Sequence, residues 1–168
     1  MHPFTVRSTT EDDWREARTL RLEALGDTPL AFGEHLADAE HLPEDEWRSR
    51  GARGTNPHSC LLAAVDDATG RWVGTMGGYV RPSGQPLLVG VYVTPDRRGH
   101  AAGVTDALLD GVEAWAATEG SSLHLEVHSE NPRAQAYYRR RGYEPTGRTQ
   151  AYVLDPSQTE LEMVRRLR

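Results

Sequence analysis

A run of small and basic residues at positions 97–104 has the composition of an anion-binding turn. It follows the apolar segment 87–93, which predicts a strand, and it precedes an amphipathic segment that predicts a helix. Such a turn directs free backbone N–H groups and the positive end of the helix dipole at a phosphate. No Gly-Lys-Ser/Thr is present, and the glycine spacing does not fit a dinucleotide-binding turn. The alternative is a connecting loop that is merely rich in glycine.

A second polar segment lies on the strand predicted at residues 123–127. His124, Glu126 and His128 alternate, so their side chains point to one face of that strand. Two histidines and a carboxylate are a ligand set that zinc accepts. This spacing is common by chance, so we predict a polar cleft here and no metal.

The next segment predicts a helix with one polar face. Asn131 is a favourable N-cap, Pro132 suits the first helical position and Gly142 suits the stop. Ala134 and Tyr138 follow Asn131 at i+3 and i+7, on one face of this helix.

The remaining pattern predicts one α/β domain over residues 1–168. The strand–helix–strand order across residues 89–127 implies a parallel pair, and the hairpins before it imply antiparallel strands. Strands are predicted at 4–7, 59–65, 71–80, 87–93, 123–127, within 144–153 and at 159–167, and helices at 11–25, from 43, at 104–119 and from 132. Residues 30–41 fit neither pattern.

The composition excludes several classes of protein. The 168 residues carry a net charge of −6, which argues against a nucleic-acid partner, although Arg97, Arg98 and His100 form one local cationic spot. The longest apolar run, 60–65, is too short to span a bilayer, and residues 1–5 lack the pattern of a signal peptide. The single Cys60 suits a reducing compartment, so we expect a cytoplasmic protein with no membrane association.

The two segments together resemble motifs A and B of the GCN5-related N-acetyltransferases, the GNAT family. The first motif is matched by the sequence from Arg98 to Gly103, after a Val-x-Val-x-Pro strand end. The second is matched by Asn131, Ala134 and Tyr138, followed by Gly-Tyr in place of Gly-Phe. Ala101 stands where the family has a glycine, which is compatible with binding only if φ is negative there.

The resemblance implies the GNAT fold, an α/β (α+β) arrangement. It is a mixed, mostly antiparallel twisted sheet flanked by helices, with a central parallel strand pair. It also implies acetyl-CoA as co-substrate, whose pantetheine arm would lie along residues 91–93. On this basis the cofactor-binding residues are Val91, Tyr92, Val93, Arg98, Gly99, His100, Ala101, Ala102, Gly103, Val104, Asn131 and Tyr138.

The catalytic residues that the resemblance implies are Glu126 and Tyr138. Glu126, in a Leu-Glu-Val strand, resembles the general base of the ribosomal-protein alanine acetyltransferase branch. Tyr138 would protonate the leaving thiolate, a nearly balanced transfer because a thiol has a pKa of about 8.5 and a phenol about 10. The alternatives are a structural ion pair for Glu126 and a core position for Tyr138, although Tyr137 is the better candidate for the core.

The activity implied is acetyl transfer to a primary amine by direct attack. We expect a small-molecule amine in a closed acidic pocket, with Glu34, Glu40 or Glu44 as its carboxylates. A protein N-terminal or lysine acetyltransferase is the alternative enzyme, and a non-catalytic acyl-CoA-binding sensor is the alternative of another class. The partners are therefore acetyl-CoA and an amine acceptor. The sequence is compatible with a homodimer and does not define the oligomeric state.

Overall fold

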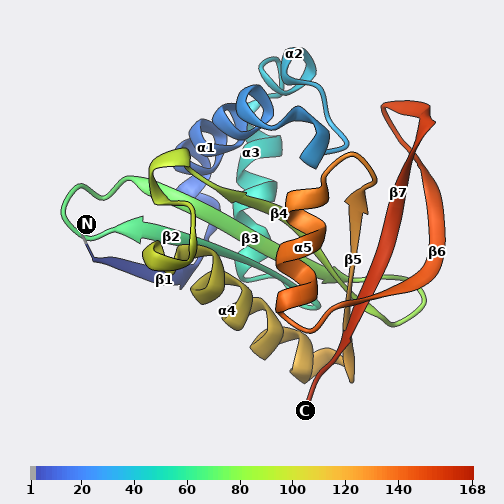
Figure 1. Ribbon diagram of the computed structural model, residues 1–168. Coiled ribbons are helices and arrows are strands. Elements are labelled where there is room, and N and C mark those ends of the chain that lie inside the picture. Colours follow the sequence, from blue (N-terminus) through green and yellow to red (C-terminus); the bar gives the residue numbers. More distant parts are fainter. Residues whose placement is uncertain (1–2) are drawn as a thin grey trace.

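Seven strands form one sheet in the order β1-β2-β3-β4-β5-β7-β6 (Figure 1). The computed structural model describes residues 3–168, so Met1 and His2 of the N-terminal segment lie outside the described residues. Of the pairs of neighbouring strands, β4–β5 is parallel and the others are antiparallel, which confirms the predicted fold class. The strands are Phe4–Ser8 (β1), Ser59–Asp66 (β2), Trp72–Val80 (β3), Pro86–Val93 (β4), Ser122–His128 (β5), Glu144–Tyr152 (β6) and Asp155–Arg166 (β7).

Helices cover both faces of this sheet. Neighbouring residues of a strand, such as Ala63 and Ala64, belong to different core clusters because successive side chains point to opposite faces. One cluster includes buried residues of α4 and Tyr138 of α5, and the other includes buried residues of α1, α2 and α3. No helix in residues 3–168 is both long enough and apolar enough to cross a membrane. The helices are Trp14–Asp27 (α1), Leu36–Ala39 (α2), Glu44–Gly51 (α3), Val104–Glu119 (α4) and Pro132–Arg140 (α5).

The first helix begins later than predicted. A 3-10 turn, Glu11–Asp13, comes before α1, and the Asp13 carboxylate accepts a hydrogen bond of 2.8 Å from the Thr10 N–H. The same carboxylate pairs with Arg7 at 2.8 Å, which ties β1 to the start of the helix. This ion pair is a tertiary contact that the helical pattern does not reveal.

Arg141 fixes α5 to α4. A basic run such as residues 139–141 usually lies at a solvated helix end. The Arg141 guanidinium is instead largely buried. It donates hydrogen bonds to Asp106 at 2.9 Å, Asp110 at 2.6 Å and Glu113 at 3.2 Å. These three acids follow one another at helical spacing on the side of α4 that meets α5. The helix that carries Tyr138 is therefore held by charge as well as by apolar packing.

The parallel strands β4 and β5 separate soon after they meet. Their pairing extends over two residue pairs and ends at Leu88 and Leu125. Beyond that point residues 89–93 of β4 have no partner on the side of β5. An unpaired strand edge presents free N–H and C=O groups that can accept another extended chain.

A β-bulge turns β4 away from its neighbour. Gly77 pairs with Val89 and Thr75 with Tyr92, so two residues of β4 lie opposite one residue of β3. Gly90, in this bulge, has a φ of 65°, which glycine adopts without strain. The bulge bends the strand where the gap between β4 and β5 opens.

A glycine in β3 is required by close packing. A Cβ atom at Gly78 would lie 2.6 Å from a ring carbon of Trp115 and 2.9 Å from the Leu87 carbonyl oxygen. Gly78→Ala should therefore lower the free energy of unfolding by about 1–3 kcal/mol. The matched control is Gly26→Ala in α1, where the nearest atom is 4.0 Å away and alanine should stabilise the helix by up to about 1 kcal/mol. Denaturant unfolding measures both, and equal stabilities of the two variants would contradict this packing.

Candidate active site

The turn between β4 and α4 presents six free backbone N–H groups. The N–H groups of residues 99–101 and 104–106 have no hydrogen-bond partner within residues 3–168. Gly99 and Gly103 have φ angles of 97° and 72°, which reverse the chain and open the start of α4. A Cβ atom at either glycine would meet nothing within 4 Å, so the space over the turn is open. These amides and the helix dipole together form a surface suited to an anion.

Alanine at position 101 is compatible with this turn. Ala101 lies in the 3-10 turn His100–Ala102, and His58 is the one residue other than glycine in residues 3–168 with a positive φ. The φ angle of Ala101 is therefore not positive, as an alanine in place of the family's glycine requires. No strain at Ala101 opposes the binding of a pyrophosphate.

The arginines of the turn are bound within the fold. The Arg98 Nε donates to the Val93 carbonyl oxygen at 2.8 Å, and the guanidinium forms an ion pair with Asp27 at the end of α1. Arg97 is buried and pairs with Asp66 at 3.1 Å. The cationic spot expected here is thus neutralised by carboxylates, and the backbone amides supply most of the attraction for an anion. Arg98 holds the turn against α1.

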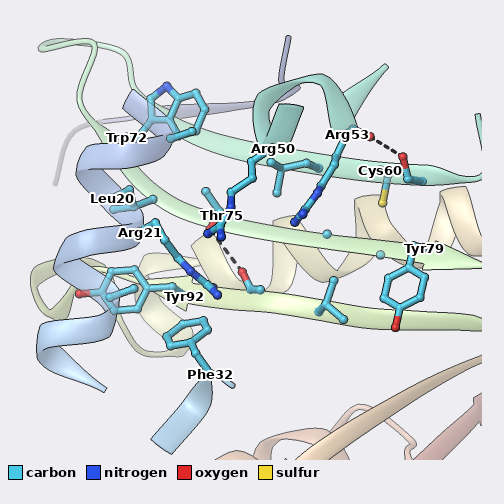
Figure 2. A pocket seen from close by; sticks show the side chains of 18 of the residues that line it. Leu20, Arg21, Phe32, Arg50, Arg53, Cys60, Trp72, Thr75, Tyr79 and Tyr92 are labelled. Carbon is cyan, nitrogen blue, oxygen red and sulfur yellow. Dashed lines mark hydrogen bonds between the residues drawn. The ribbon is translucent and has the colours of Figure 1, made fainter. Parts of the chain in front are cut away.

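A cavity of about 460 Å³ lies on the face of the sheet that α1 and α3 cover (Figure 2). Its lining includes Val89, Gly90 and Tyr92, which belong to the part of β4 that β5 leaves unpaired. The volume is in the range of small-molecule sites. One side of the open β4 segment thus forms a wall of a ligand-sized space.

Glu126 points to the same face of the sheet as this cavity. His124, two residues before Glu126, is the register partner of Leu87, which in turn is paired with the cavity residue Tyr79. Paired residues on neighbouring strands share a face, as do residues two apart on one strand. The side chain of Glu126 lies just past the last residue pair that joins β4 to β5.

The environment of Glu126 favours its neutral form. Burial raises the pKa of its carboxyl group, and the nearby Glu160 carboxylate raises it further. The Gln150 amide donates a hydrogen bond to Glu126, and an Arg81 nitrogen lies 3.8 Å from its other oxygen. A carboxylate with a raised pKa binds a proton more tightly than usual, which suits a general base.

The two histidines of this strand are both buried and differ in their partners. The Nδ1 of His128 accepts the Glu130 N–H at 3.0 Å, so its Nε2 carries the proton toward Gln158, 2.6 Å away. Burial lowers the pKa of His124, with Arg81 as the next cause. In the described part of the chain no three His, Cys, Asp or Glu side chains gather in a way that could hold a metal ion.

On α5 the core position is occupied by Tyr138, and not by Tyr137 as the sequence suggested. Tyr138 is 7 % exposed and packs in the core, and its hydroxyl has no hydrogen-bond partner in residues 3–168. Burial raises the pKa of Tyr138 well above its usual value. Tyr137 is only partly buried and donates to Asp106 at 2.7 Å. Asn131 caps the helix, accepting the Ala134 N–H at 3.2 Å.

The structure thus places the predicted site residues around one gap in the sheet. The turn and α5 lie on the α4 side, and Glu126 lies on the cavity side. Their roles in binding and catalysis stay predictions. The cavity arginines Arg21, Arg50 and Arg53 were missed, because the contacts that bring them together join segments far apart in the chain.

Comparisons with known proteins agree on one family. The acetyltransferase (GNAT) family matches residues 14–143. A GNAT superfamily phosphinothricin acetyltransferase from Sinorhizobium meliloti, solved with AcCoA, is 19% identical with a TM-score of 0.75, over 98% of this chain and 88% of that one. Ribosomal-protein-alanine N-acetyltransferase from Brucella melitensis is 24% identical with a TM-score of 0.75, over 97% and 99% of the two chains. Nourseothricin acetyltransferase is 25% identical with a TM-score of 0.59, over 67% of each chain. None of the curated proteins matches the sequence significantly.

These matches define the class of protein as acyl-CoA-dependent N-acetyltransferases. Since the family match spans most of its length and both motifs, the chain belongs to the acetyltransferase (GNAT) family. The resemblance inferred from the sequence is confirmed.

The contact between Arg98 and Asp27 predicts how the turn responds to substitution. Asp27→Asn should loosen the turn and lower the affinity for CoA by roughly three- to tenfold, part of what a charge-assisted hydrogen bond contributes. Isothermal titration with CoA measures this change. Asp38→Asn in α2 removes the same charge away from the turn and should leave the affinity unchanged. A higher affinity in Asp27→Asn would show instead that the freed Arg98 contacts the phosphates directly.

Proposed function

We propose that this protein transfers the acetyl group of acetyl-CoA to a primary amine of a small molecule. The observation that carries the proposal is the open segment of β4. It has a free edge toward β5, and it lines the cavity on the α1 and α3 face. A thioester held along this segment would therefore face an amine held in the cavity.

The proposed binding of acetyl-CoA is supported by the shape and the chemistry of the turn. Six free N–H groups at a helix start suit a pyrophosphate, and nothing blocks the space over Gly99 and Gly103. The unpaired residues 89–93 suit the amide groups of the pantetheine arm, which can pair with them as an added strand. The solved phosphinothricin acetyltransferase holds AcCoA, which supports the same co-substrate here.

In the proposed reaction the amine nitrogen attacks the thioester carbonyl carbon, so that a C–N bond forms and the C–S bond breaks. Glu126 accepts the proton that the amine loses, directly or through a water molecule. Free N–H groups of β4 stabilise the charge that develops on the carbonyl oxygen. Tyr138 donates its proton to the departing sulfur. The core places its phenol on the α4 side of the sheet, opposite Glu126.

The size of the cavity favours a small molecule over a protein acceptor. A volume of about 460 Å³ under α1 and α3 accommodates a compact ligand, whereas a protein acceptor needs an open groove for an extended chain. The Leu-Glu-Val strand around Glu126 is the feature that favours a protein N-terminal acetyltransferase. We therefore keep that activity as the second candidate.

Glu126→Gln tests the general base. The wild-type rate should rise with pH through the raised pKa of Glu126, as the carboxylate forms. The variant should lose about 10²–10⁴-fold at neutral pH and recover at high pH, where the amine loses its own proton. Steady-state kinetics as a function of pH measures the difference.

Glu160→Gln is the matched control, because it removes the charge that raises the pKa of Glu126. In Glu160→Gln the rise of the rate with pH should occur at lower pH than in the wild type, without the loss of rate expected for Glu126→Gln. A pH profile of Glu126→Gln that parallels the wild type at similar rates would leave Glu126 with a structural role.

Tyr138→Phe tests the general acid and separates an enzyme from an acyl-CoA sensor. The ring and its packing remain, so CoA affinity should change little while turnover falls by about 10²–10⁴-fold. Tyr137→Phe should keep its turnover but lose about 1 kcal/mol of stability with its hydrogen bond to Asp106. Wild-type turnover in Tyr138→Phe would show that water protonates the sulfur. CoA binding without acetylation of any amine by the wild-type protein would favour the sensor.

A further inference from the structure

Among the residues that the structure describes, three arginine side chains and no carboxylate line the cavity. Arg21 comes from α1, Arg50 from α3, and Arg53 from the 3-10 turn Ala52–Gly54 that follows α3. Figure 2 shows the three side chains reaching toward the same space above the sheet. The rest of the lining is mostly apolar or aromatic. The charged groups that an acceptor would meet are therefore cationic.

Two of these arginines form ion pairs with the same carboxylate. Arg21 lies 2.9 Å from the Glu34 Oε2, and Arg50 donates to both Glu34 oxygens at 3.0 Å and 2.8 Å. Arg50 also pairs with Glu46 at 3.0 Å. Glu34 and Glu46 carry two negative charges against the three guanidinium charges, and their ion pairs are with Arg21 and Arg50.

The acidic pocket expected from the sequence is therefore absent from this cavity. Glu34 is occupied by two arginines, and its pKa is lowered by Arg50 and Arg21 against the effect of burial. Glu40 and Glu44 are exposed and do not line the cavity. No carboxylate of the lining is available to hold a cationic acceptor.

Arg53 carries the charge that is left over. Within residues 3–168 its guanidinium has no hydrogen bond and no ion pair with a carboxylate. Partial burial lowers the pKa of Arg53 and the charge of Arg50 lowers it further, whereas Glu46 and Glu34, which form no ion pair with it, raise it. An anion in direct contact with Arg53 would favour its charged form. Arg53 is exposed to solvent as well as part of the cavity lining. Gly90 and Val89 of β4 belong to the same lining.

We propose that the acceptor carries a carboxylate in addition to its amine, and that Arg53 binds this carboxylate. A guanidinium matches the two oxygens of a carboxylate in a planar, bidentate pair. The carboxylate at Arg53 would direct the amine toward the open segment of β4 around Gly90. The acceptor class is thus an amino acid or a compound of like charge, and not a polycationic amine. This inference rests on the proposed function.

The test compares carboxylate and carboxamide acceptors in matched pairs. The acceptors are straight-chain amino acids of increasing length, from glycine to aminohexanoate, each with its carboxamide. In the wild-type enzyme the carboxylates should have the higher kcat/KM, with one chain length preferred. Arg53→Gln should lower kcat/KM for the carboxylates by roughly 10- to 100-fold, mainly through KM, and should leave the carboxamides nearly unchanged. Comparing the two ratios cancels the difference in amine basicity within each pair.

Two further variants serve as controls. Arg53→Lys keeps the charge without the planar fork and should recover part of the carboxylate preference. Arg48→Gln removes a cation from the same segment of chain but outside the cavity, and it should leave the preference as in the wild type.

A binding measurement separates this inference from the proposed function. Hexanoate should raise the melting temperature of the wild-type protein more than hexanamide does, and this difference should vanish in Arg53→Gln. An equal loss on both acceptor classes, or a wild-type preference for carboxamides, would overturn the carboxylate site while leaving the transferase intact. If no amine were acetylated, the proposed function would fail, and the thermal shift would still decide whether Arg53 binds a carboxylate.

Discussion

The early separation of β4 from β5 is the constraint on which the site depends. Two strands that share a sheet normally satisfy one another's backbone groups along their length, but here pairing stops at Leu88 and Leu125. The bulge at Gly90 maintains the opening, and the core clusters on the two faces hold the strands apart. A free strand edge in the middle of a sheet can serve an extended ligand from one face and a second ligand from the other.

Ion pairs within the fold neutralise the arginines Arg97 and Arg98 near the site. Arg97 and Arg98, in the turn between β4 and α4, are bound to carboxylates of other elements and serve the fold. Attraction for an anion at the turn therefore comes from backbone amides, which carry no net charge and need no counter-ion. In the cavity the balance differs, because Arg53 forms no ion pair with a carboxylate within residues 3–168. An overall net charge of −6 says nothing about either local balance.

Much of the fold and part of the site could be predicted from the sequence, because their causes are local. The alternation around Glu126 and the glycines at positions 99, 103 and 142 mark strands, turns and helix ends through short-range geometry. Contacts between elements were not predictable. The burial of Arg141 depends on how α5 meets α4, and the pairing of Glu34 depends on how its loop folds between α1 and α3. Such contacts are absent from any periodic pattern.

The ion pair between Arg98 and Asp27 joins the two proposed substrate regions through one helix. Asp27 ends α1, and the same helix contributes Ala17, Leu20 and Ala24 to the cavity lining. Under the proposed function, a displacement of α1 by an acceptor would therefore also displace the turn that is proposed to face the co-substrate. Thermodynamic reciprocity then requires that whichever ligand binds first change the affinity for the second by the same factor in either order. Under the proposed function, the affinities for the two substrates would in this way be coupled through the position of a single helix.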